Sequence, residues 1–136
     1  MEKRKINAII EKASDGSYSI YMDATDTDYL ATGTGMTVAE AKKDFESAYE
    51  AIRKEYASEE KPFEEVEFNY IYDIPSFLQE YAYAFTLAGL ERITGVNQKQ
   101  LGHYISGFRK PSPRTAKKIQ DGVRAFCNQL STIHFA

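Results

Sequence analysis

The sequence predicts an α+β protein, with a small antiparallel sheet and one covering helix followed by an all-α domain. Strand-like alternation, turn signals and one long helical pattern fill residues 1–75, whereas helical patterns dominate residues 76–136. The charge changes sign at the same point, from 9 Lys+Arg and 17 Asp+Glu before it to 8 and 3 after it. We therefore expect two domains, 1–75 and 76–136, with different partners.

The bulk composition predicts a globular protein of the cytoplasm. Hydrophobic residues make up 43% and charged residues 27%, which suits a packed core. No apolar run approaches the ~20 residues that span a bilayer, and the N-terminus lacks the apolar region of a signal peptide. The single cysteine, Cys127, excludes an internal disulfide and fits a reducing compartment. Its neighbours Ala125 and Phe126 indicate a buried thiol.

The first domain should open with a β-hairpin. Apolar residues alternate along residues 5–13 and again along 18–22, and the Asp-Gly pair between them favours a tight turn. Residues 29–35 predict a third, irregular strand. Thr37 and Glu40 form a capping box that starts an amphipathic helix ending near Tyr56. A last strand follows from the alternation of Val66 to Tyr72, and Pro75 should end it.

The start of the predicted helix resembles a known family. Gly35-Met36-Thr37-Val38-Ala39-Glu40-Ala41, after an Asp-Gly hairpin and an acidic loop, is similar to the Gly-x-Thr-x-x-Glu-Ala of the HicB-type antitoxin domain. The resemblance covers roughly residues 5–73, although the family often has Pro-Asp where this chain has Met22-Asp23. It implies a partial ribonuclease-H-like sheet and, as partner, a small basic ribonuclease toxin of the HicA type. The expected toxin-binding residues are Asp23, Asp26 and Asp28.

Residues 86–114 predict two short helices around a tight turn. Thr86 can cap the first helix, and Gly95 can end it in the left-handed conformation. Asn97, with Gln100 three residues later, can cap the second helix, which Gly107 closes. A turn of about four residues between such helices lets the second helix enter a DNA major groove. The alternative from spacing alone is an ordinary αα-hairpin.

This segment resembles the helix-turn-helix of the lambda-repressor/Cro class. The similarity rests on Gly-Val-Asn-Gln at the turn and Ile-Ser-Gly-Phe-Arg-Lys-Pro-Ser at the exit. One departure is Gly89, which softens the first helix by about 1 kcal/mol relative to alanine. HicB proteins commonly join their sheet domain to such a DNA-binding module, so each resemblance supports the other.

Polar and basic side chains of this segment are the candidate DNA contacts. Long amides and a lysine suit base edges, so the expected base-reading residues on the exposed face are Gln98, Lys99, Gln100 and His103. The expected phosphate contacts are Asn97, Tyr104, Arg109, Lys110, Arg114, Lys117 and Lys118. The alternative for the basic cluster is a solvated surface patch.

Apolar stripes predict the core of the second domain. Residues 76–85 carry aromatic side chains that should be buried in a first helix. Ser112 is a good N-cap for the last helix, with Pro113 at its first position. That helix should continue to about Gln129 with a buried stripe of Ala116, Ile119, Val123, Phe126 and Leu130.

The sequence carries no convincing catalytic or metal site. Asp23, Asp26 and Asp28 cluster in one loop, whereas a ribonuclease-H-like magnesium site needs carboxylates from separate strands. His103 and His134 stand alone, without metal-ligand spacing. We therefore expect no enzyme activity, no metal and no cofactor.

Taken together, the expectation is a DNA-binding antitoxin of a type II toxin–antitoxin system. It would neutralise a small ribonuclease toxin and repress its own operon as a homodimer or higher homo-oligomer. Two alternatives are an orphan transcriptional regulator without a toxin and, from another class, a degenerate magnesium-dependent nuclease.

Overall fold

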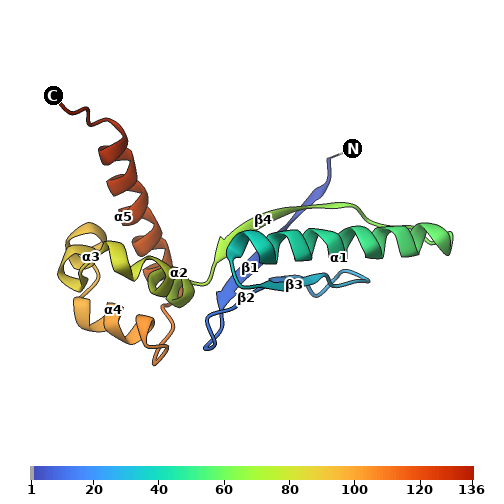
Figure 1. The fold of residues 1–136 in the computed structure, drawn as a ribbon, viewed down its shortest axis with the longest axis horizontal. Helices are drawn as coiled ribbons and strands as arrows, with labels where there is room; N and C mark the ends of the chain where they lie inside the picture. Colours follow the sequence, from blue (N-terminus) through green and yellow to red (C-terminus); the bar gives the residue numbers. More distant parts are fainter. Residues whose placement is uncertain (1) are drawn as a thin grey trace. The chain divides into compact units, whose positions relative to one another are not determined.

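A computed structural model describes residues 2–136 as two compact units, Met1–Asp73 and Ile74–Ala136 (Figure 1). The division lies two residues before the predicted boundary. The first unit contains β1 (Arg4–Lys12), β2 (Tyr18–Met22), β3 (Thr32–Gly35), α1 (Val38–Ser58) and β4 (Val66–Tyr72). The second contains α2 (Ile74–Tyr81), the 3₁₀ turn η1 (Ala82–Ala84), α3 (Leu87–Thr94), α4 (Gln98–Ile105) and α5 (Pro113–Ser131). The predicted α+β class is confirmed.

The sheet is mixed rather than antiparallel. Its strand order is β3-β2-β1-β4, with antiparallel β1/β2 and β2/β3 pairs. The expectation is wrong for β4, which runs parallel to β1 with Ile10 opposite Tyr72. The 21 residues of α1 span about 31 Å and bring the chain back to the end where β3 began. The next strand therefore runs in the same direction as β3 and β1.

Helix α1 covers one face of this sheet and completes its core. The predicted alternation of β1 is confirmed, because Ile6, Ala8 and Ile10 are buried against it. The helix lies so close to β3 that a β-carbon on Gly33 would stand 2.4 Å from the Phe45 backbone nitrogen. Only glycine admits that approach. The first unit is thus a two-layer structure.

In the second unit, α4 and α5 pack against α3, and α2 packs against α4. The core cluster consists of Leu78, Leu90, Val96, Leu101, Tyr104 and Ile119. Gln79 Nε2 of α2 donates a hydrogen bond to the Ile105 carbonyl oxygen at 2.7 Å, which ties the end of α4 to α2. This all-α arrangement agrees with the predicted helical domain.

The last helix is longer than the partner it packs against. The 19 residues of α5 extend about 28 Å, whereas the eight of α3 extend about 12 Å. Only the first part of the predicted stripe is therefore buried, with Ile119 enclosed and Leu130 51% exposed. The predicted burial of Cys127 is wrong for the same reason, since its thiol lies on the exposed end of α5.

A glycine sets the contact between α3 and α5. A β-carbon on Gly122 would lie 2.5 Å from the Ile93 carbonyl oxygen and 2.8 Å from the Thr94 α-carbon. Both are backbone atoms, so the two helices would have to separate. At Gly102 of α4, by contrast, the nearest atom would be Leu87 Cδ1 at 3.8 Å, an ordinary contact distance.

We therefore expect Gly122→Ala and Gly102→Ala to differ in sign. The first should lower the free energy of unfolding of the helical unit by about 1–3 kcal/mol through overpacking. The second should raise it by up to about 1 kcal/mol, because alanine is the better helix former. Urea denaturation followed by circular dichroism measures both. Equal effects would contradict the close approach at Gly122.

Candidate nucleic-acid interface

The α3–turn–α4 segment is capped at the predicted positions. Thr86 Oγ1 accepts a hydrogen bond from the Gly89 amide at 2.9 Å. Gly95 follows α3 with φ of 74°, in the left-handed region. Asn97 Oδ1 accepts from the Lys99 amide at 2.8 Å and caps α4. The predicted capping residues thus mark the ends of these helices as expected.

Two side chains of α3, neither of them predicted, hold the turn. Thr94 Oγ1 donates to the Leu90 carbonyl at 2.7 Å and accepts from the Val96 amide at 3.1 Å. Glu91 Oε1 accepts from the Gln98 amide at 3.0 Å, in the first turn of α4 where amides lack helical partners. These bonds fix the orientation of α4 relative to α3. The bond of Glu91 had a weak sequence signal, because its partner Gln98 lies seven residues further along the chain.

The outward side of α4 presents polar side chains. Leu101 and Tyr104 point into the core. Since successive helical residues are about 100° apart, Lys99 and His103 share the opposite stripe. The predicted base-reading residues Gln98, Lys99 and Gln100 are all exposed, and His103 is half-buried.

Tyr104 is a core residue. Its side chain is 6% exposed within the cluster formed with Leu101 and Ile119. The predicted phosphate contact is therefore wrong. Tyr104 stands three residues after Leu101, so it returns to nearly the same side of the helix.

An aromatic side chain extends the polar surface beyond α4. The rings of His103 and Phe108 lie 5.1 Å apart at 60°, and the Arg109 guanidinium lies 5.6 Å from the Phe108 ring. Phe108 is 70% exposed. Sequence reasoning did not select it, although an aromatic residue in a basic loop was an available signal. The arrangement places a cation and an aromatic face beside His103.

The five predicted cations around the start of α5 differ in their surroundings. Ser112 Oγ accepts from the Thr115 amide at 3.2 Å, which confirms the predicted N-cap. Arg114 is exposed in the first turn, and Arg109 and Lys110 are exposed in the preceding loop. Lys117 Nζ instead pairs with Asp121 at 2.7 Å.

Lys118 has a structural bond that the sequence did not predict. Its Nζ donates to the Gly95 carbonyl oxygen at 3.1 Å. That oxygen lies just beyond the C-terminus of α3, where the helix dipole attracts a cation. The side chain thereby connects α5 to the turn before α4.

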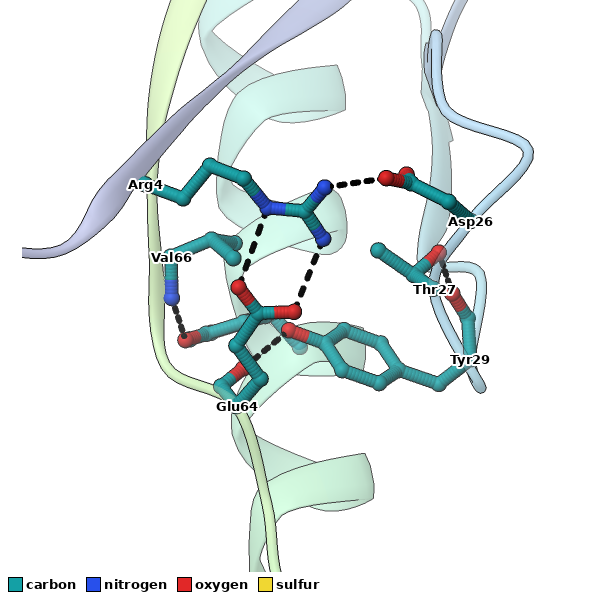
Figure 2. A network of polar contacts seen from close by, with 7 residues as sticks. Arg4, Asp26, Thr27, Tyr29, Glu64 and Val66 are labelled. Atoms are coloured by element: carbon teal, nitrogen blue, oxygen red, sulfur yellow. Dashed lines mark hydrogen bonds and ion pairs between the residues drawn. The ribbon is translucent and has the colours of Figure 1, made fainter.

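The three predicted toxin-binding aspartates have different neighbours. Asp26 pairs with Arg4, which also holds Glu64 through two hydrogen bonds of 2.8 and 3.0 Å (Figure 2). These two carboxylates raise the pKa of the Arg4 guanidinium. Asp28 lies elsewhere in the loop, where its carbonyl accepts from the Tyr56 hydroxyl at 3.2 Å. Asp23 stands at the end of β2, its amide donating to the Asn7 carbonyl at 2.8 Å.

Residues 2–136 contain neither a metal-binding cluster nor a membrane-spanning helix. No group of three or more His, Cys, Asp or Glu side chains in this range is placed to hold a metal ion. No helix of this range has the length and apolar character needed to cross a membrane.

Comparisons of the chain with protein-family models, with curated proteins and with solved structures gave no match.

The two neighbouring lysines of α5 give a stability prediction. Lys118→Ala should lower the free energy of unfolding of the helical unit by about 1 kcal/mol, because the Gly95 carbonyl loses a charged donor. Lys117→Ala removes an exposed i,i+4 ion pair and should cost about 0.5 kcal/mol or less. Thermal unfolding of the two variants provides the comparison. If Lys118→Ala were the milder change, the bond to Gly95 would not be stabilising.

Proposed function

We propose that this protein binds double-stranded DNA through α4 and regulates transcription. The observation that carries the proposal is the outward surface of α4, where exposed Gln98, Lys99 and Gln100 lie beside His103 on a helix held by α3. A major groove about 12 Å wide admits one α-helix. Glutamine amides can pair with adenine and lysine with guanine, so these residues supply base contacts.

The exposed cations near α4 supply the phosphate contacts of this proposal. Arg109, Lys110 and Arg114 lie in the loop before α5 and in its first turn. The amides of a helix N-terminus also attract phosphate, which favours a backbone contact near Arg114. Such contacts set the register of a protein on DNA, whereas the residues of α4 select the sequence. Lys117 and Lys118 use part of their donor capacity in bonds to Asp121 and to the Gly95 carbonyl oxygen.

We further propose that the acidic unit makes this regulator an antitoxin. The support is the resemblance of residues 35–41 to the HicB-type domain, together with the excess of acidic residues in this unit. A basic ribonuclease toxin of the HicA type would bind the acidic unit, and opposite charges would speed the encounter. The protein would then repress its own operon, as a homodimer on a two-fold operator.

Co-expression with the product of the adjacent reading frame tests the antitoxin role. A short, basic, histidine-containing product that arrests growth alone and is retained and neutralised by this protein would support it. A protein that binds the DNA upstream of its gene without such a product would be an orphan regulator. Mg²⁺-dependent cleavage by the purified protein would favour the nuclease alternative.

Base reading by α4 predicts a loss of selectivity in a double variant. Lys99→Ala with Gln100→Ala should weaken binding to the DNA upstream of the gene, each lost base contact costing about 1–3 kcal/mol. Binding to scrambled DNA should fall much less. Gel shifts with both duplexes measure the ratio, and Lys54→Ala with Gln129→Ala is the matched control. Unchanged selectivity would remove α4 as the reading helix.

Phosphate anchoring predicts a change in salt dependence. Arg114→Ala should reduce the slope of log affinity against log salt concentration by about one unit, since one fewer counterion is released. Binding to all sequences should weaken alike. Fluorescence anisotropy between low and high salt measures the slope, with Lys54→Ala as the control. A slope equal to that of the unchanged protein would exclude Arg114 from the phosphate contacts.

A further inference from the structure

The sheet face opposite α1 carries an apolar row across three strands. In the register of the sheet, Ile9 of β1 stands opposite Tyr21 of β2 on one side and Ile71 of β4 on the other. Side chains alternate between faces along a strand, so these three lie on the face that α1 leaves uncovered. Tyr21 is 37% and Ile71 36% exposed. The row is a partly exposed apolar strip at the centre of the sheet.

Carboxylates flank this row on both sides. Glu11 and Asp73 stand two residues beyond Ile9 and Ile71, and Glu67 and Asp23 belong to the same alternating set on the other side. The Tyr21 hydroxyl donates to Glu11 Oε1 at 3.0 Å. Burial raises the pKa of Tyr21 to about 12, and the charges of Glu11, Asp23 and Asp73 add to that shift. The shift agrees with three carboxylates facing the same ring.

We propose that this open sheet face, formed by Ile9, Tyr21 and Ile71 with Glu11, Asp23, Glu67 and Asp73, binds a small basic protein. The inference rests on the proposed antitoxin function, in which that protein is the toxin, and it specifies the surface used. Within the described strands β1, β2 and β4, Lys5 is the one cation in the alternating set that contains Ile9, Tyr21 and Ile71.

The charge of the face selects the kind of occupant. Nucleic acids and anionic membranes carry the same sign as the face and are repelled. Two copies of the face would also repel each other, which disfavours self-association through it. A partner with an apolar side chain at its centre and Lys or Arg around it matches both features, because interface energy concentrates in central apolar contacts with a polar rim.

Of the three predicted toxin-binding aspartates, Asp23 belongs to the open face. Asp26 pairs with Arg4, whose guanidinium also binds Glu64 (Figure 2), and Asp28 lies in the loop before β3. Of the three aspartates, only Asp23 should therefore contribute to binding.

The test uses the full chain and a catalytically inactive form of the toxin from the adjacent reading frame, in calorimetric titrations. Ile71→Arg places a cation in the apolar row and should weaken binding at least tenfold. Ser47→Arg, which adds the same side chain on exposed α1, is the matched control. Glu67→Lys should slow association and reduce its salt dependence, whereas Glu55→Lys on α1 should not. Circular dichroism verifies that each variant folds.

The outcomes separate the inference from the function on which it rests. If the face variants bind the toxin like the unchanged protein, the open face is not the site, yet the antitoxin function stands. If the unchanged protein neither binds the toxin nor rescues growth, both are overturned. If Ile71→Arg dissociates a dimer of this protein and leaves toxin binding unchanged, the face binds a second copy of the chain. The proposed partner would then be wrong. DNA binding should be unaffected by every variant that leaves the oligomeric state unchanged.

Discussion

The position of α4, the proposed DNA-reading helix, depends on how the C-terminal end of α3 is held. Gly122 lets α5 pack directly against the backbone of Ile93 and Thr94, and Lys118 binds the Gly95 carbonyl from the same side. From α3, Thr94 holds the Val96 amide and Glu91 the Gln98 amide. These contacts fix α4 relative to two other helices. A helix that reads DNA needs such support, because base contacts tolerate little error in position.

A comparable constraint shapes the sheet unit. The glycine at position 33 lets α1 lie on β3, and the length of α1 decides the direction of β4. With one helix over one face, the other face carries its own mixture of apolar and acidic side chains. The two units of the chain thus differ in charge. One is acidic and has an open sheet face, and the other is basic and has an exposed helix. Each unit suits a different kind of partner.

Residues of one type have unequal roles in this protein. Arg114 is exposed, Lys117 pairs with Asp121 and Lys118 caps α3, although all three lie in the first turns of α5. In the acidic unit, Asp23 borders the open face while Asp26 is engaged by Arg4. The net charge of a unit predicts the sign of the charge on its partner. The assignment of roles needs the neighbours of each side chain.

The sequence by itself determined the features that depend on nearby residues. Thr86, Gly95, Asn97 and Ser112 mark helix ends because caps form within a few residues, and the alternation along β1 marks its buried face. The tertiary structure alone decided what depends on distant ones. The parallel pairing of β4, the burial of Tyr104, the exposure of Cys127 and the bonds of Glu91 and Lys118 all involve segments brought together by folding. A local sequence pattern shows the hydrophobic periodicity of a helix or strand. It does not show which other elements will pack against that helix or strand.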